Sequence, residues 1–269
     1  MKKLVALLIG IITNVYVYSQ TSEEWFRKGE KAYQKEDYNT AVECYKKAAN
    51  LGSIDACGIL SFMYYFGTVT GKRNVEMAQL WANRTGVNKI LDADIVMALI
   101  SYYDGKYEET ISILNYWKGD VLYDEAKLAL AISYMVSGDK YARFWGKQKA
   151  EPLVKDVYNK LHDYEDRPYF YYAACAILAK IEFEKEWDVN NDKVYKYLEE
   201  FGTFGEDDFI YCPLAEYVTG LILSHIEDKD IKQMGMIRLE VASQYNYENG
   251  FKILYPFANE IKQYYNEHK

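Results

Sequence analysis

The sequence predicts an all-α protein, a solenoid of about six stacked antiparallel helix hairpins with a C-terminal capping helix. Two observations lead to this fold class. Apolar residues recur at three- and four-residue spacing along almost the whole chain, which is the period of a helix with one buried face. A short signal built around a small residue also returns down the chain, as it does where one structural unit is repeated. No segment has a convincing period-two strand pattern.

The recurring signal is an alanine, three variable residues, an apolar residue and then a small one. We expect the small residue where two antiparallel helices approach closely, because a larger side chain would hold the helices apart. The first hairpin carries a glycine at this position. The small residues are Gly29, Ser61, Ala98, Ala131, Ala179 and Gly220.

The first three hairpins are the most regular part of the chain. Each first helix is followed by a loop and by a second amphipathic helix. Asn39 and Asn74 are suited to cap second helices at the N-terminus, and Gly52 and Gly86 to end them. The three loops lie at residues 35–39, 68–74 and 104–107.

The second half of the chain has longer and less regular intervals. Residues 140–150 are expected to be irregular, and Pro152 is expected in the first turn of a helix over residues 151–162, where proline is tolerated. Residues 200–213 form the longest interruption, and residues 250–267 are expected to cap the array. The first helices of this half are predicted at residues 124–139, 169–185 and 214–226.

Residues 25–53 resemble a tetratricopeptide repeat, and residues 55–86 are similar to its longer-looped relative, the Sel-like repeat. The first segment departs from the pattern at Ala32, where an aromatic residue is usual, and at Ser53, where proline is usual. Residues 92–118 look like a third hairpin. The matching residues are Trp25, Gly29, Ala41, Tyr45 and Ala48 in the first segment, Ala56, Leu60, Tyr64, Gly67, Ala78 and Trp81 in the second, and Ala98, Tyr107 and Trp117 in the third.

This resemblance implies a right-handed α-solenoid over residues 20–269, with clear repeats at residues 23–119 and degenerate repeats at residues 120–269. It also implies a binding function, because such arrays hold partners on a concave face lined by the first helices.

The first twenty residues have the three parts of a secretory signal. Lys2 and Lys3 supply the charge, residues 4–17 the apolar stretch, and residues 17–19 the cleavage site. We therefore predict a signal peptide at residues 1–19 and export to the periplasm or the exterior of a bacterial envelope, with no stable membrane insertion of the mature chain. An uncleaved membrane anchor is the alternative, although the stretch is short for a span.

The chain is acidic, with a formal net charge of -8. This balance argues against nucleic acid and against a general attraction to anionic membranes, both of which require clustered Lys and Arg. It favours a basic or neutral partner. The four cysteines have no metal-type spacing. Since exported chains can form disulfides, bridges between Cys44 and Cys57 or between Cys175 and Cys212 stay open beside the alternative of free buried thiols.

No pattern of catalytic or cofactor-binding residues stands out. The three histidines have no Cys or carboxylate at ligand spacing, and acidic doublets at helix starts and in loops are most simply solvated groups. We predict no enzyme, no cofactor and no metal site. The alternative from this class is a helical enzyme whose site uses the loop at residues 200–213, with Asp207, Asp208 and Tyr211.

The candidate partner-binding residues follow the small positions of the first three hairpins. Aromatic side chains there give large, stiff contact area, suited to a peptide or a sugar. The alternative is that they pack against the neighbouring hairpin. We predict a scaffold that binds a protein or peptide; a carbohydrate-binding or glycan-handling envelope component is the alternative, suggested by 28 tyrosines. The candidates are Tyr33, Gln34, Tyr65, Phe66, Tyr102 and Tyr103.

Overall fold

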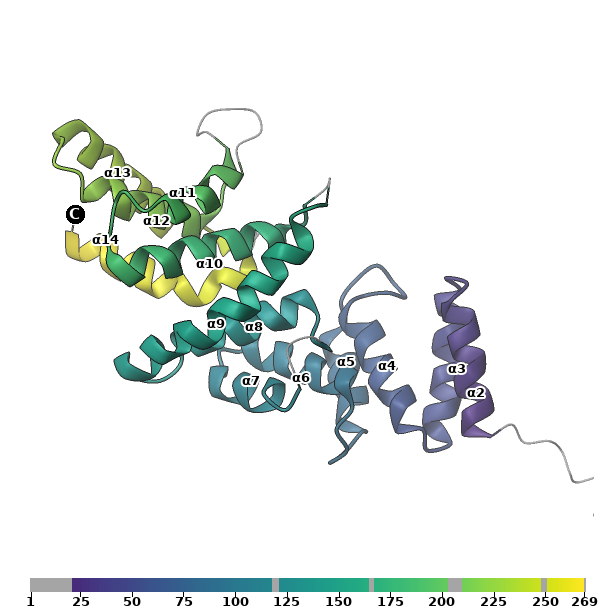
Figure 1. Cartoon of the computed structure of the whole chain (residues 1–269). Coiled ribbons are helices and arrows are strands. Elements are labelled where there is room, and N and C mark those ends of the chain that lie inside the picture. The colour runs from purple at the N-terminus through teal and green to yellow at the C-terminus, as the bar shows by residue number, and fades with distance from the viewer. Residues whose placement is uncertain (1–20, 118–120, 165–166, 203–209, 248–250, 269) are drawn as a thin grey trace, which may run out of the picture. The chain divides into compact units, whose positions relative to one another are not determined.

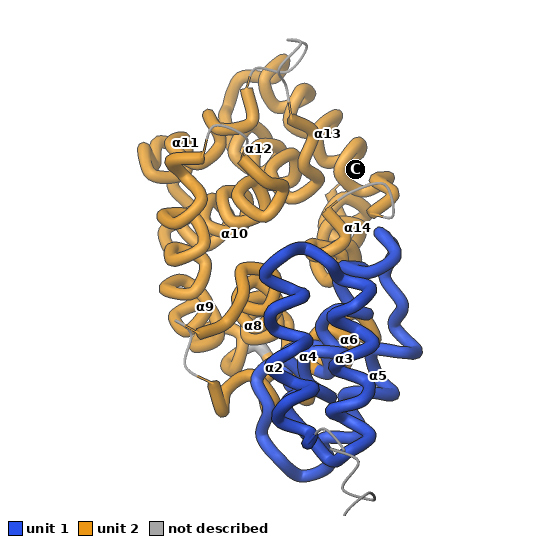
Figure 2. Tube along the Cα trace, turned by 90° about the vertical axis from the view of Figure 1, so that its right-hand side faces the viewer, with its two compact units in different colours: residues 1–97 blue, residues 98–269 orange. Residues whose placement is uncertain are grey.

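The protein is all-helical in the computed structural model, which describes residues 21–117, 121–164, 167–202, 210–247 and 251–268 (Figure 1). Within these ranges no strand is present, and neighbouring helices pack in pairs. The predicted signal peptide at residues 1–19 lies outside the described residues. The chain divides into two compact units, an N-terminal unit up to Met97 and a C-terminal unit from Ala98 (Figure 2). The division falls within helix α6 (Leu91–Tyr103).

The N-terminal unit contains two helix pairs, α2 with α3 and α4 with α5. A capping box at Thr21 begins α2, and Asn74 begins α5 as predicted, since its side chain accepts a hydrogen bond from the Met77 amide at 3.0 Å. Asp37, rather than Asn39, caps α3. The four helices are α2 (Ser22–Tyr33), α3 (Tyr38–Asn50), α4 (Ile54–Tyr65) and α5 (Val75–Asn83).

The C-terminal unit contains the remaining helices. The pairs α8 with α9, α10 with α11 and α12 with α13 are neighbours in sequence and in space. The elements are α7 (Tyr107–Leu114), α8 (Asp124–Val136), α9 (Lys140–Leu161), α10 (Tyr169–Glu186), α11 (Asp192–Leu198), η2 (Glu199–Phe201), α12 (Pro213–Ser224), α13 (Lys229–Ser243), η4 (Lys252–Phe257) and α14 (Ala258–His268).

The six small residues of the recurring signal are all buried, from Gly29 to Gly220. A Cβ built on Gly29 would lie 2.7 Å from the Tyr45 ring, and one on Gly220 would lie 3.0 Å from the Gly235 carbonyl oxygen. The first distance is too short for real atoms, and the second is tighter than most real contacts; the Cβ on Gly220 would also lie 2.8 Å from Leu239 Cγ. The small residues therefore permit close helix contact, as the sequence predicts.

Helix α9 corrects the expected irregular segment at residues 140–150. The Asp139 side chain caps it by accepting from the Ala142 amide at 2.8 Å, and Pro152 lies inside the helix instead of in its first turn. Gly146 lets α9 approach α8 closely, because a Cβ at this position would lie 1.8 Å from the carbonyl oxygen of Tyr134.

The C-terminal segment does more than cap the last hairpin. It forms η4 and then α14, and η4 packs on α8. Lys180 of α10 pairs with Glu260 of α14, and the Tyr217 ring of α12 meets the Tyr264 ring edge-on at 5.8 Å. The segment therefore returns across α8, α10 and α12, the first helices of the three hairpins in the C-terminal unit (Figure 1). The four cysteines are free and buried, so neither the Cys44–Cys57 bridge nor the Cys175–Cys212 bridge is formed.

Candidate functional site

The first candidate site is a cavity of about 560 Å³ in the C-terminal unit, which we call the tyrosine cavity. The turn between α6 and α7 forms one wall, and Gly105 with a φ of +77° allows this turn. The loop after α13 and the segment around η4 form the other walls. Six tyrosines line the cavity: Tyr102, Tyr103, Tyr107, Tyr245, Tyr247 and Tyr255.

Hydrogen bonds fix the α6 wall of this cavity. The Tyr102 hydroxyl donates to the carbonyl oxygen of Ile253, which ties the wall to the C-terminal segment. The Tyr103 hydroxyl donates to Glu125 Oε1 at 2.7 Å, and the Lys252 ammonium lies 5.4 Å from the centre of the Tyr103 ring. The contacts of Tyr102 with Ile253 and of Tyr103 with Lys252 join segments about 150 residues apart in sequence.

Tyr247 has an unsatisfied polar group beside this cavity. The residue is only 6% exposed, and its buried hydroxyl has no hydrogen-bond partner among the described residues. Its ring meets the rings of Tyr245 and Tyr255 edge-on at 5.2 and 5.7 Å. Burial raises the pKa of Tyr247, so the group is a neutral hydroxyl at physiological pH. Leaving such a group unbonded costs about 1–3 kcal/mol.

A second cavity of about 720 Å³ adjoins the first, and the two share Tyr107, Tyr255 and Pro256. We call it the charged cavity. Its walls come from α8, α9, α10, η4 and α14. Its charged lining residues are Arg143, Lys147, Lys180, Glu184 and Glu260, and its apolar ones include Met135, Phe144 and Phe257.

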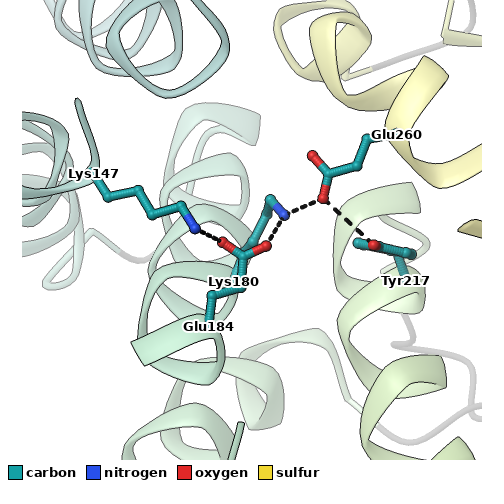
Figure 3. Close-up of polar contacts among 5 residues, drawn as sticks. All are labelled: Lys147, Lys180, Glu184, Tyr217 and Glu260. Atoms are coloured by element: carbon teal, nitrogen blue, oxygen red, sulfur yellow. Dashed lines mark hydrogen bonds and ion pairs between the residues drawn. The ribbon is translucent and has the colours of Figure 1, made fainter. Parts of the chain in front are cut away.

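A buried ion network forms one wall of the charged cavity (Figure 3). Lys180 of α10 pairs with Glu184, one turn away, and with Glu260 of α14. Lys147 of α9 pairs with the other oxygen of Glu184. The Tyr217 hydroxyl donates to Glu260 Oε1 at 3.4 Å.

The network keeps its central groups ionised although they are buried. Burial by itself would lower the pKa of Lys180, but the carboxylates of Glu184 and Glu260 outweigh it and raise that pKa. Burial would likewise raise the pKa of Glu184, but Lys180 and Lys147 hold it below its usual value. The sequence signal for this network is a Lys and a Glu four residues apart in the charged segment KIEFEKE that ends α10.

The lining of the two cavities is more basic than the chain as a whole. Five basic and three acidic side chains line them, whereas acidic residues outnumber basic ones in the sequence. The expected preference for a basic or neutral partner rests on the net charge of the whole chain and stays a prediction. The basic residues are Arg143, Lys147, Lys180, Lys252 and Lys262; the acidic ones are Asp104, Glu184 and Glu260.

The structure separates the six residues predicted from the sequence. Tyr102 and Tyr103 line the tyrosine cavity, while the other four belong to the N-terminal unit. Tyr33 and Phe66 are partly exposed, and Gln34 is an exposed C-cap. Tyr65 and Tyr102 are buried, at 1% and 2% exposure, so their rings belong to the core instead of standing free on a surface.

Tyr65 has a clear structural role in the N-terminal unit. Arg73 donates to its hydroxyl at 3.0 Å, and the guanidinium stacks over the ring at 4.1 Å from its centre. The pair ties the loop after α4 to the helix. These contacts of Tyr65 therefore lie within its own hairpin.

The loop at residues 200–213 is described only in part. Asp207 and Asp208, the proposed carboxylates of the enzyme alternative, lie outside the described residues. Tyr211 is described, and its buried hydroxyl has no hydrogen-bond partner there. Its ring stacks on the ring of Tyr245, a lining residue of the tyrosine cavity, with the ring centres 5.2 Å apart. Tyr211 itself lines neither cavity. Among the described residues, no three His, Cys, Asp or Glu side chains gather as a metal site.

Comparisons with models of known protein families, with curated proteins and with solved structures found no match to this chain. A search for membrane spans over the described helices found none that is both long and apolar enough to cross a bilayer.

Proposed function

We propose that this chain is a non-enzymatic scaffold of tetratricopeptide and Sel-like repeats that binds an extended segment of a protein partner in the tyrosine and charged cavities. The observation that carries the proposal is the Tyr247 hydroxyl, which is buried beside a cavity without a hydrogen-bond partner. The hydroxyl oxygen is covered in the free protein, so we expect the Tyr247 side chain to turn toward the cavity when a ligand binds. A ligand atom that then bonds this hydroxyl removes its desolvation penalty. Export through a signal peptide at residues 1–19 is part of the proposal, and its support is the sequence alone.

The chemistry of the two cavities defines the segment that fits them. The tyrosines offer flat apolar faces for side chains, and their hydroxyls offer donors and acceptors for a peptide backbone. The basic excess of the lining favours a neutral or acidic segment. An extended peptide can follow both cavities because they share Tyr107, Tyr255 and Pro256.

Replacing Tyr255 with alanine is expected to weaken peptide binding at least tenfold, because this ring lines both cavities. The side chain is 62% exposed, so the melting temperature should change little. Peptides selected from a random displayed library on the wild type provide the probe, and calorimetry gives the affinities. Tyr116→Ala is the matched control, since Tyr116 is 61% exposed and lines neither cavity. If Tyr255→Ala and Tyr116→Ala lose the same affinity for the peptide, the peptide does not bind in the two cavities.

Replacing Tyr247 with phenylalanine is expected to leave the free protein as stable as the wild type or more stable, because it removes an unbonded buried hydroxyl. The same change should weaken peptide binding about tenfold, the worth of one hydrogen bond to a ligand. Thermal melts and calorimetry measure the two effects. Tyr211→Phe removes a second unbonded buried hydroxyl outside the cavities, and should raise stability while binding stays unchanged. If Tyr247→Phe binds like the wild type, this hydroxyl does not hold the ligand.

A carbohydrate ligand is the second candidate, and the six tyrosines of the tyrosine cavity favour it, because sugar rings stack on aromatic faces. A glycan array probed with the wild type and with Tyr255→Ala separates the two. If the library yields no binding peptide, and the wild type binds glycans that Tyr255→Ala does not bind, the ligand is a carbohydrate and the peptide proposal is wrong.

A further inference from the structure

The charged cavity has more cations in its lining than carboxylates to pair with them. Its lining holds three cations, Arg143, Lys147 and Lys180, and two carboxylates, Glu184 and Glu260. Lys180 pairs with both carboxylates, and Lys147 pairs with Glu184 (Figure 3). Arg143 takes part in no ion pair in the part of the chain that the structure describes. The lining therefore has one positive charge in excess, and Arg143 is the cation that carries it.

A hydrogen bond orients the Arg143 side chain and leaves the end of its guanidinium available. The Nε donates to the carbonyl oxygen of Gly138 at 3.1 Å. The two terminal nitrogens have no hydrogen-bond partner among the described residues. The nearest acidic side chain in sequence, Asp139, accepts from the Ala142 amide and forms no ion pair with Arg143. The terminal nitrogens of a guanidinium form a planar fork that matches the two oxygens of a carboxylate.

The surroundings of Arg143 strengthen its attraction for an anion. Lys147 follows it by four residues and lines the same cavity, and like charges at this spacing on a helix repel each other. Phe144 and Met135 also line this cavity. Apolar side chains beside a charge displace water, so an ion pair there is screened less than one in open solvent. An anion that enters the cavity therefore relieves the repulsion and gains a partly shielded ion pair.

We propose that the segment bound in the two cavities carries a carboxylate that pairs with Arg143. This inference rests on the proposed function, because it names a chemical group of the same ligand. A carboxylate fits better than a phosphate, since the lining has one positive charge in excess and a phosphate group carries nearly two negative charges. The carboxylate belongs to an Asp or Glu side chain of the segment or to a peptide C-terminus, and the test separates these two sources.

The probes are the peptides selected on the wild type, synthesised with an amidated and with a free C-terminus. In the amidated peptides each Asp is replaced by Asn and each Glu by Gln, one at a time. Calorimetry measures their affinities for the wild type and for Arg143→Gln. Lys149→Gln is the matched control, because it removes the same charge from the same helix, and Lys149 lines neither cavity. Arg143 and Lys149 are both exposed, so both variants should melt like the wild type.

One acidic residue of the peptide should be coupled to Arg143. Replacing it with its amide should weaken binding to the wild type about tenfold, the worth of a hydrogen bond between charged groups. Arg143→Gln should bind the unchanged peptide about tenfold more weakly and show no further loss with the replaced peptide. Lys149→Gln should bind both peptides like the wild type. If removal of the free C-terminal charge alone shows this coupling, the carboxylate is the terminal one.

A failure of this inference differs from a failure of the proposed function. Peptides that need Tyr255 but bind Arg143→Gln as tightly as the wild type would show that the cavities hold a segment without this pairing. Equal losses in Arg143→Gln and Lys149→Gln would assign the effect to the net charge of the protein and would also overturn the pairing. If no selected peptide needs Tyr255, the proposed function is wrong, and the pairing is wrong with it.

Discussion

Replacing Gly146 with alanine is expected to destabilise the C-terminal unit by about 3 kcal/mol, the upper range for overpacking a core. The added methyl carbon would lie 1.8 Å from the carbonyl oxygen of Tyr134, so α8 and α9 must move apart along their contact. The sign of the change is informative, because glycine to alanine inside an unobstructed helix stabilises by about 1 kcal/mol. Urea unfolding followed by circular dichroism measures it.

Gly58→Ala is the matched control for this substitution. Gly58 also lies buried in a helix, and its added carbon would come within 2.4 Å of an obstacle. That obstacle is the Cγ2 methyl of Ile90, the end of a side chain that can rotate, whereas the obstacle at Gly146 is backbone. The loss at Gly58 should therefore be clearly smaller. Increased stability of Gly146→Ala would show that the two helices are not in close contact.

The helices and their contact points were predictable because their signals are local. Periodicity indicates a buried face, and a small residue at a fixed offset marks a helix crossing. The expected helices at residues 169–185 and 214–226 agree with α10 and α12 to within two residues, and all six small positions are buried.

Helix α9 was not predictable in the same way. Its N-terminal half contacts the unit through Gly146 and Ala150, while its large aromatic residues are exposed, Phe144 at the charged cavity. The apolar pattern there is that of an exposed face, and periodicity cannot tell it from an irregular segment. Pro152 adds a misleading signal, because proline inside a helix is rare.

The two cavities also escape sequence reasoning, for a different reason. The tyrosine cavity forms where residues 102–107 meet residues 244–262, and the charged cavity forms where α8, α9 and α10 meet residues 255–263. Both meetings depend on the return of the C-terminal segment across the unit. No local pattern encodes such a contact. The sequence identifies Tyr102 and Tyr103, but it does not reveal the unbonded hydroxyl of Tyr247 or the local basic excess.

Replacing Lys180 with methionine is expected to destabilise the C-terminal unit by about 3–5 kcal/mol, because it removes the central cation of a buried ion network. Glu184 would keep only Lys147 as a partner while most of its surface stays shielded from water. Lys160→Met is the matched control. Lys160 pairs with Asp124 at 2.9 Å but is 52% exposed, so its loss should cost less than about 1 kcal/mol.

A second variant separates lost charge pairing from lost packing. Adding Glu184→Gln to Lys180→Met removes the stranded carboxylate and should restore part of the stability. If the double variant is no more stable than the single one, the loss comes from packing around the Lys180 side chain, and the ion pair is not its cause.

The pH dependence of this loss has a definite sign. The pKa of Glu184 is lowered in the folded protein, so its stabilising effect is present above its unfolded pKa of about 4.3 and is lost as pH falls through the folded value. The pKa of Lys180 is raised, so its effect is present below about 10.4 and is lost only as pH rises through the folded value. The free-energy gap between the wild type and Lys180→Met should therefore stay constant from about pH 5 to 10 and narrow in acid. A gap that persists after acid has protonated Glu184 would contradict the ionic origin of the effect.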